Sequence, residues 1–278
     1  MTAIRNLLAR DYGLRVDTVQ PHPGGFESDC WVADETWLVK CWKSTAAPAR
    51  LPLLSDLRAA GLPVPAAIPN RSGELHSTAN SRPYAVFPYV AGRTAVHAAD
   101  WRQTAAALRR VHGVTGIDLP AADMDEPEID ALGERLDHPW IADRQDEVAE
   151  NIQRLQRAVE RAGEVPNVLC HRDFGGANLI VDDHRALAVL DWDQAVLGPA
   201  EHDLWIAAEG GHIAEFLTEY GAHGLDIDQL EYALLARALR DMAARVLSGV
   251  DQPGVDTWGF DRIARLDRDL TAFRPFCR

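Results

Sequence analysis

Cysteine is rare in this sequence of 278 residues, and long apolar runs and internal repeats are absent from it. Four cysteines are scattered without the C-x-x-C spacing that is typical of zinc and redox sites, namely Cys30, Cys41, Cys170 and Cys277. The N-terminal segment 1–10 lacks the long apolar stretch of a signal peptide, and no segment approaches the length of a membrane helix. We therefore expect a cytoplasmic protein with free thiols, without a zinc site and without a membrane partner.

Basic residues are also scarce, since 28 Lys and Arg face 42 Asp and Glu and leave a net charge of −14. This balance argues against nucleic acid as the main partner and favours a cationic ligand through the long-range field of the protein. The acidic excess can equally serve solubility alone. Apolar residues make up 47% of the chain, which predicts a globular protein with a substantial core.

The sequence patterns divide the chain into two parts. Residues 1–91 contain strand-like segments and one helix at 50–61, whereas residues 92–278 are mostly helical apart from short strands around 168–190. We predict an α+β protein with a sheet-rich N-terminal lobe, a connector at 91–94 and a larger helical lobe. A cleft between two lobes commonly holds a ligand.

A lysine lies in the middle of an apolar strand. The segment TWLVKCW at 36–42 has a period of two that places Leu38, Lys40 and Trp42 on one face and Val39 on the other. Lys40 therefore has large apolar neighbours whichever face is buried, and a lysine in such surroundings needs an anionic partner. The alternative is a side chain that extends its ammonium to solvent from an edge strand.

Three other segments have clear local signals. The pair Gly24–Gly25 marks a turn between two potential strands within 22–33, and 84–90 is strand-like. The segment 100–113 predicts a helix, with Asp100 as its N-terminal cap.

The segment CHRDFGGANLIV at 170–181 places a carboxylate and a carboxamide on a loop between apolar strands. We expect Asp173, Asn178 and Asp191 to lie at the ends of short strands, which would hold these side chains while leaving them open to solvent. The pair Gly175–Gly176 allows the loop to bring Asn178 back towards Asp173. The strands, which we expect to pair with one another, are predicted at 168–170, 179–181 and 186–190.

Phosphoryl transfer is the chemistry that needs this trio. Transfer of a γ-phosphoryl group requires Mg²⁺ to neutralise charge and a carboxylate to orient the attacking hydroxyl. Mg²⁺ prefers a few hard oxygen ligands, which suits Asn178 and Asp191, and Asp173 then suits the role of base. The alternative for Asp173 and Asn178 is a hydrogen-bonded turn, in which both residue types are common.

The wider pattern resembles a known family. H-R-D-x-x-x-x-N, followed by an apolar strand and Asp191, is similar to the catalytic and metal-binding segments of the protein-kinase-like fold. The DWD motif and the GPAEHDLW that follows it resemble the aminoglycoside phosphotransferase family of small-molecule kinases, as does LRRVHG at 108–113. The resemblance implies a nucleotide-binding lobe with a small antiparallel sheet (1–91) and a catalytic and substrate-binding lobe (92–278).

The resemblance also implies ATP and Mg²⁺ as cofactors, with ATP between the lobes. Lys40 would bind the α- and β-phosphates, the connector 88–92 would offer backbone groups to the adenine, and the turn 23–28 would cover the phosphates. A plain hairpin explains that turn equally well. The implied nucleotide-binding residues are Lys40, Gly25, Ser28, Pro88 and Val90.

One feature departs from the kinase pattern. Kinases pair this lysine with a helix glutamate, yet residues 43–85 contain only two acids, Asp56 and Glu74. Asp56 lies at the margin of the apolar face of the predicted helix and is the candidate partner. Otherwise the nucleotide alone holds Lys40.

Other polar residues flank the motif. We interpret His171 as a buried histidine that braces the loop, and Asp203 as a structural residue that caps a helix or bonds the catalytic loop. Asp193 is interpreted as a surface residue, and Arg172 has no assigned role.

The acceptor is a further expectation from the resemblance. The family acts on hydroxyls of small, often cationic molecules: aminoglycosides and other antibiotics, and in related branches choline, sugars and hydroxylated amino acids. The run DMDEPEID at 123–130 is the densest acidic candidate for binding such a molecule, although a solvated loop or helix face explains it as well. Further candidates are Glu209, Glu215, Asp241 and Asp251.

The predicted function is direct, in-line transfer of a phosphoryl group from ATP to a hydroxyl of a small, cationic molecule such as an antibiotic. The alternatives are a metabolite kinase of the same fold and a nucleotide-binding pseudokinase. A protein kinase is disfavoured, because Gly198 and Pro199 follow Asp191 within eight residues and leave no room for an activation loop. A metal-dependent hydrolase is disfavoured because H-E-x-x-H is absent.

Overall fold

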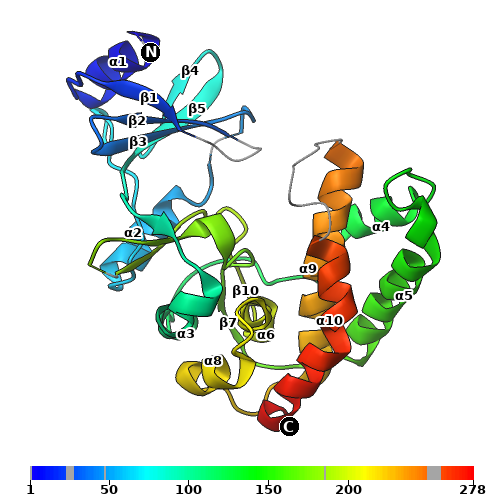
Figure 1. Cartoon of the computed structure of the whole chain (residues 1–278). Helices are drawn as coiled ribbons and strands as arrows, with labels where there is room; N and C mark the ends of the chain where they lie inside the picture. The colour runs from blue at the N-terminus through cyan, green and yellow to red at the C-terminus, as the bar shows by residue number, and fades with distance from the viewer. Residues whose placement is uncertain (1, 23–27, 47, 185, 249–257) are drawn as a thin grey trace. The chain divides into compact units, whose positions relative to one another are not determined.

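A computed structural model describes residues 2–22, 28–46, 48–184, 186–248 and 258–278 of the chain. They form an α+β protein that divides into two compact units (Figure 1). Unit 1 contains Met1–Ala95 and Asp173–Ala195, and unit 2 contains Val96–Arg172 and Val196–Arg278. Unit 1 thus includes a segment from far along the chain.

Unit 1 is built on an antiparallel sheet, with the strand order β1-β2-β3-β5-β4 among the described residues. Its strands are β1 (Val19–His22), β2 (Ser28–Ala33), β3 (Trp37–Trp42), β4 (Ser77–Ala79) and β5 (Arg82–Pro88). Cys30 on β2 is directly opposite Lys40 on β3, and Ser28 is opposite Trp42. Since directly opposite residues point to the same side of a sheet, Ser28 and Lys40 share one face.

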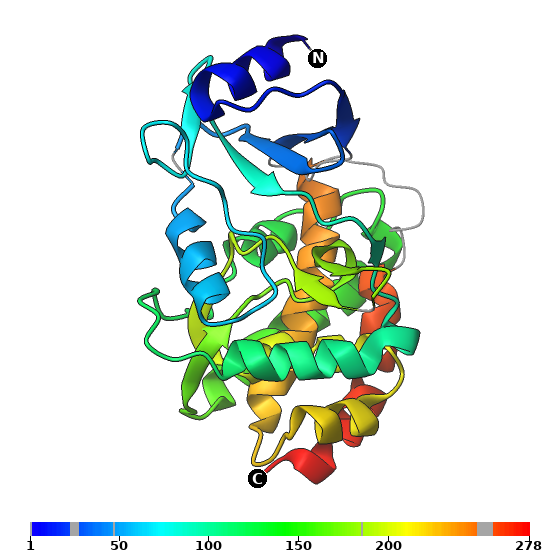
Figure 2. The ribbon, with the colours of Figure 1, turned by 90° about the vertical axis from the view of Figure 1, so that its left-hand side faces the viewer.

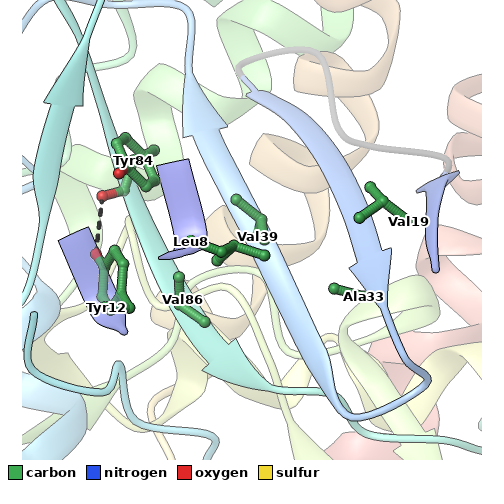
Figure 3. Close-up of a cluster of buried hydrophobic side chains, with 7 residues drawn as sticks. All are labelled: Leu8, Tyr12, Val19, Ala33, Val39, Tyr84 and Val86. Atoms are coloured by element: carbon green, nitrogen blue, oxygen red, sulfur yellow. Dashed lines mark hydrogen bonds between the residues drawn. The ribbon is translucent and has the colours of Figure 1, made fainter. Parts of the chain in front are cut away.

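The other face of this sheet carries the core of unit 1. The helical segments α1 (Thr2–Leu7) and η1 (Leu8–Tyr12) pack on it, as Figure 2 shows. The buried cluster in Figure 3 consists of Leu8, Tyr12, Val19, Ala33, Val39, Tyr84 and Val86. The Tyr12 hydroxyl donates a hydrogen bond to the Tyr84 carbonyl at 3.4 Å. The predicted alternation along β3 is confirmed, because Val39 lies in this cluster while Lys40 lies on the opposite face.

The prediction of one helix within residues 1–91 was wrong. In addition to α2 (Leu51–Ala59), which was predicted, the chain is helical through α1 and η1. These two segments are too short to form on helix propensity alone, and burial of Leu8 and Tyr12 against the sheet stabilises them.

A second, smaller sheet attaches the segment Asp173–Ala195 to the rest of unit 1. The strands pair in the order β6-β8-β9. Their bounds are β6 (Arg93–Thr94), β8 (Leu179–Val181) and β9 (Leu187–Val189). Gly92 packs so tightly against β8 that a side chain there would meet the Val181 carbonyl oxygen at 2.5 Å. The connector predicted at 91–94 is therefore partly a strand.

Unit 2 is mainly helical. Its helical segments are α3 (His97–His112), α4 (Pro127–Gly133), η2 (Ala142–Arg144), α5 (Gln145–Arg161), α6 (Glu201–Leu204), α7 (Ile206–Glu209), α8 (Ile213–Tyr220), α9 (Ile227–Ser248), α10 (Trp258–Phe273) and η4 (Arg274–Phe276). Helix α9 packs against α4, α5, α6 and α10, and Figure 1 shows it alongside α10. Among the described residues no helix is both long and apolar enough to cross a membrane.

Two predictions about unit 2 need correction. The strand predicted at 168–170 is β7 (Asn167–Cys170), and it pairs with β10 (Val196–Pro199) rather than with the other two predicted strands. Helix α3 begins at His97, one turn before the predicted cap. The Asp100 carboxylate still accepts the backbone N–H of Val96 at 2.8 Å, so it satisfies a helix-end donor from within the first turn.

Candidate active site

The loop after β7 closes on itself and joins Asn178 to Asp173. The Asn178 Nδ2 donates to Asp173 Oδ2 at 2.7 Å and to the Asp173 carbonyl at 3.1 Å. Gly176 has a φ of 52°, a left-handed conformation that favours glycine, whereas Gly175 is extended with a φ of 174°. The predicted return of Asn178 towards Asp173 is confirmed, but of the two glycines only Gly176 has a backbone conformation that favours glycine.

Asp191 lies at the end of β9, next to this loop. The Leu190 N–H donates to the Asn178 carbonyl at 2.8 Å, so the residue before Asp191 is tied directly to Asn178. Asp191 has a φ of 57°, which costs a non-glycine residue roughly 1 kcal/mol or more. The next residue, Trp192, is buried and donates its Nε1–H to the Val189 carbonyl at 3.2 Å. This anchored turn holds Asp191 and Asp193 on either side of a buried indole.

Lys40 is held by both of these carboxylates. Its Nζ lies 3.0 Å from Asp191 Oδ1 and 3.0 Å from Asp193 Oδ2, and its side chain is only 16% exposed. Burial alone would lower the pKa of Lys40, but the charges of Asp191 and Asp193 outweigh it and raise that pKa. Lys40 is therefore an ammonium that bridges two carboxylates.

These contacts decide two predictions, one about Asp56 as the partner of Lys40 and one about Asp193. It has anionic partners, as its place on an apolar strand predicted, but Asp56 is not one of them: that side chain is exposed to solvent on α2. The interpretation of Asp193 as a surface residue was wrong, since it contacts Lys40 and accepts a hydrogen bond from Trp42 Nε1 at 3.4 Å. The left-handed backbone at Asp191 causes this, because it redirects the chain after β9.

The substitution Asp193→Asn tests this bridge. We expect Lys40 to become less basic, because one of the two charges that stabilise its ammonium is lost. Labelling of Lys40 by an amine-reactive reagent at alkaline pH, followed by mass spectrometry, should then be severalfold faster than in the wild type. Asp56→Asn is the matched control and should leave the labelling rate unchanged. Equal rates for wild type and Asp193→Asn would contradict the bridge.

The remaining residues predicted for nucleotide binding are placed as follows. Ser28 is buried on the Lys40 face of the sheet, with its Oγ 3.7 Å from Cys30 Sγ. Pro88 is the last residue of β5. Val90 lies two residues further along, and within the described part of the chain its backbone N–H and C=O form no hydrogen bond. Gly25 lies outside the described residues.

Unit 2 fixes the backbone that leads into Asp173. The fully buried Asp203 carboxylate accepts the backbone N–H groups of His171 at 2.6 Å and Arg172 at 2.7 Å. It also lies 3.2 Å from His112 Nε2, which donates to it, and the Tyr220 hydroxyl lies 2.6 Å from His112 Nδ1. Burial opposes ionisation of Asp203, but these hydrogen bonds and charges hold its pKa below the usual range. The interpretation that Asp203 bonds the catalytic loop is therefore confirmed, and His171 is a buried histidine as predicted.

The acidic run 123–130 is not uniformly available to a ligand. Its Glu126 is buried and forms ion pairs with Arg240 and Arg172. The exposed acids of the run are Asp123, Asp125, Glu128 and Asp130.

The other acids predicted to bind a ligand also differ in whether they are available to one. Glu209 and Asp241 are both bound by Arg262, so they are occupied within unit 2. Glu215 is exposed on α8, and Asp251 lies outside the described residues. A count of acidic residues therefore overestimates the acids that an acceptor could contact.

His202 is a buried histidine in the neutral form. Its Nε2–H donates to Gln229 Oε1 at 3.1 Å, and its Nδ1 accepts a hydrogen bond from Arg172 Nη1 at 3.0 Å. Burial, followed by the positive charge of Arg172, lowers the pKa of His202 to about 4.

This shift predicts a pH-dependent loss of stability. Since the unfolded histidine has a pKa of about 6.5, the unfolded state binds more protons than the folded state between pH 6.5 and 4. The free energy of unfolding should therefore fall by roughly 3 kcal/mol from this residue as the pH decreases through that range. Urea unfolding at several pH values should show a shallower pH dependence for His202→Gln than for the wild type. Identical slopes would contradict a neutral, buried His202.

Comparison with known proteins identifies the family. A family model described as the phosphotransferase enzyme family matches residues 18–236, a range that contains Lys40, Asp173, Asn178 and Asp191. The chain belongs to the phosphotransferase enzyme family. It is an enzyme that transfers phosphoryl groups, as the resemblance in the sequence implied. Among curated proteins, none matches this phosphotransferase in sequence.

Solved structures share the fold of this phosphotransferase. Spectinomycin phosphotransferase APH(9)-Ia, in complex with ADP and spectinomycin, matches with a TM-score of 0.76 and 17% identity over 98% of each chain. An APH(2″) enzyme in complex with GDP and kanamycin matches with a TM-score of 0.69 and 13% identity over 98% of this chain and 99% of that one. A choline/ethanolamine kinase family protein from Mesorhizobium loti gives 0.67 and 17% over 99% of each chain. The predicted α+β, protein-kinase-like fold, with a small antiparallel sheet and a helical lobe, is confirmed.

Proposed function

We propose that this phosphotransferase transfers the γ-phosphoryl group of ATP directly to a hydroxyl of a small, cationic molecule, with Mg²⁺ as the metal. The observation that carries the proposal is the arrangement in unit 1 of the hydrogen-bonded pair Asp173–Asn178, the adjacent Asp191 and the largely buried Lys40. Solved structures of this fold that hold ADP or GDP with an antibiotic support it.

Asp173 takes the role of base in this proposal. Its carboxylate would orient the acceptor hydroxyl and accept the proton as the new O–P bond forms. Asn178 donates to Asp173 Oδ2 and so fixes the orientation of the carboxylate before the acceptor binds. Such pre-orientation matters because a catalytic base must be within hydrogen-bond reach of the proton it removes.

The donor atoms present fit a magnesium ion. The Asp191 carboxylate is 47% exposed, and since Asn178 Nδ2 is used by Asp173, the Asn178 oxygen Oδ1 is the atom that can ligate. One carboxylate and one carboxamide suit Mg²⁺, which retains waters and phosphate oxygens in its shell. Asn178 and Asp191 would hold the ion, and when bound it would neutralise charge on the phosphates.

Lys40 and its surroundings suit the nucleotide. Lys40 would exchange a carboxylate partner for the α- and β-phosphates, and Ser28 lies on the same face of the sheet. The backbone N–H and C=O of Val90 suit the adenine, because within the described residues they have no other partner. Pro88, the last residue of β5, would contribute its carbonyl, and Gly25 would cover the phosphates.

Charge argues for a cationic acceptor. The net charge of −14 attracts cations, and the acids of unit 2 that can bind one are those that remain exposed. They include Asp123, Asp125, Glu128, Asp130 and Glu215. An antibiotic with amino groups is a cation that the negative charge of the protein would attract. Choline is also a cation, and the similarity to a choline/ethanolamine kinase family protein makes it the second candidate.

The test is a coupled ADP-release assay with Mg·ATP. The panel contains spectinomycin, kanamycin, peptide antibiotics, choline, amino sugars and, as a control class, generic protein substrates. We expect one class of small cationic hydroxyl compound to stimulate ADP release, with a product that has gained one phosphoryl group by mass spectrometry. Binding of Mg·ATP without stimulation by any member would contradict the proposal and support a nucleotide-binding pseudokinase.

A further inference from the structure

The residue directly before Asp173 has an unusual backbone. Arg172 adopts a φ of 70°, in the left-handed region, although it is not a glycine. A side chain in this conformation brings its Cβ close to the backbone carbonyl oxygen, and such residues persist only where their surroundings hold them. Something other than local preference must therefore fix the turn that leads into Asp173.

Unit 2 holds Arg172 at both its backbone and its side chain. The backbone N–H is bound by Asp203 Oδ1 at 2.7 Å. The guanidinium Nη1 donates to His202 Nδ1 at 3.0 Å, and Nη2 lies 3.4 Å from Glu126 Oε1. The side chain is 14% exposed, so these contacts lie largely away from solvent. We call the contacts of Arg172 with Glu126 and His202 the Arg172 clamp.

Glu126 is itself held rigidly. It is 8% exposed and accepts hydrogen bonds from Arg240 Nε at 2.8 Å and from the Tyr232 hydroxyl at 2.6 Å, with a second contact to Arg240 Nη2. Burial would favour protonation, but the hydrogen bonds and charge of Arg240, with the charge of Arg172, lower the pKa of Glu126. Glu126 is thus a fixed, ionised carboxylate that neutralises Arg172 from within the same unit.

We infer that Arg172 is a positioning residue for Asp173, and that the Arg172 clamp fixes the backbone turn from which the Asp173 carboxylate projects. This inference rests on the proposed role of Asp173 as the base. It also assigns Glu126 to the reaction indirectly: this carboxylate acts through Arg172 without touching the acceptor, unlike the exposed acids of the run 123–130.

Hydrogen–deuterium exchange tests the clamp on the full-length enzyme, without any acceptor. The peptide that contains residues 170–178 should exchange at least about tenfold faster in Arg172→Gly, Arg172→Ala and Glu126→Gln than in the wild type. Arg172→Lys should restore part of the protection, because it keeps a cation beside Glu126. Arg154→Ala is the matched control: Arg154 also binds two carboxylates of unit 2, Glu231 at 2.5 Å and Asp267 at 2.6 Å. Its loss should leave the peptide unchanged.

Kinetics then separate the guanidinium from the backbone. With the acceptor that gives the highest turnover in the panel, kcat should fall roughly 10- to 100-fold in both Arg172→Gly and Arg172→Ala, while the KM for ATP stays within about threefold. Arg172→Gly should have the higher melting temperature of the two, because glycine relieves the left-handed backbone. An equal loss of kcat despite this relief identifies the side chain as the positioning element.

The outcomes distinguish the two claims. If the wild type transfers phosphate but Arg172→Gly and Glu126→Gln keep wild-type kcat and exchange, the inference is wrong and the proposed function stands. If the exchange of 170–178 rises as expected but the wild type phosphorylates nothing, the proposed function is wrong and the positioning role falls with it.

Discussion

Replacing Asp173 by asparagine should lower turnover by about 10²–10⁴-fold, while the affinity for Mg·ATP should stay within about threefold of the wild-type value. The substitution keeps the size of the side chain, and its oxygen can still accept the hydrogen bond from Asn178 Nδ2. It removes the negative charge and with it the ability to accept a proton from the acceptor hydroxyl. Coupled ADP release measures turnover, and isothermal titration calorimetry measures nucleotide affinity.

A nearby acid provides the control for this variant. Asp183 is exposed in the turn between β8 and β9, in the same unit, and Asp183→Asn should keep wild-type turnover. Near-wild-type turnover of Asp173→Asn would contradict the assignment of the base. A parallel loss of turnover and of nucleotide affinity would show that Asp173 acts on the nucleotide instead.

Asp203→Ala should destabilise the protein by about 3–5 kcal/mol, the largest effect on stability that we expect from a single substitution. The change leaves the backbone N–H groups of His171 and Arg172 buried without an acceptor, and it removes the carboxylate that receives the His112 hydrogen bond. Each buried donor without a partner costs about 1–3 kcal/mol. Urea unfolding measures the loss as a lower midpoint at an unchanged slope.

Two further variants sharpen this result. Asp203→Asn should fall between wild type and alanine, because its amide oxygen can accept one hydrogen bond while its NH₂ faces a second donor. Glu215→Ala, at an exposed position of α8, should change stability by no more than about 0.5 kcal/mol. A loss below about 1 kcal/mol for Asp203→Ala would show that the loop is held by other contacts.

Local patterns were sufficient where neighbours in sequence determine the structure. The alternation along β3 predicted that Val39 and Lys40 lie on opposite faces, because strand periodicity depends only on the strand itself, and the structure adds that the Val39 face meets the core. The loop from Asp173 to Asn178 was equally predictable, since a short glycine-containing turn between strands leaves few ways to close.

Contacts between distant segments were not predictable in this way. Asp193 stands in a polar motif, which predicts a surface residue. Its contact with Lys40 depends on the left-handed backbone at Asp191, and no local sequence pattern predicts that conformation for an aspartate. Glu126 stands among exposed acids of the same charge, and its burial is decided by Arg240, which lies 114 residues further along the chain. Composition alone cannot separate such a residue from its exposed neighbours.

The pairing of β7 was missed for a similar reason. The segment Val196–Pro199 contains a glycine and a proline and has little strand character, yet it forms β10 and pairs with β7. This segment comes directly after the turn that follows Asp191, and its position places it where it can pair with β7. The tertiary environment, rather than propensity, therefore sets this part of the sheet.

The most direct test of the account is a single-turnover experiment in which Mg·ATP with a labelled γ-phosphate is mixed with excess enzyme and the acceptor identified in the panel. We expect the label to pass from ATP to the acceptor hydroxyl at the rate of ADP formation, with none on the protein, and we expect Asp173→Asn to prevent the transfer. Label bound to the protein, or released only as inorganic phosphate, would contradict direct transfer to a small-molecule hydroxyl.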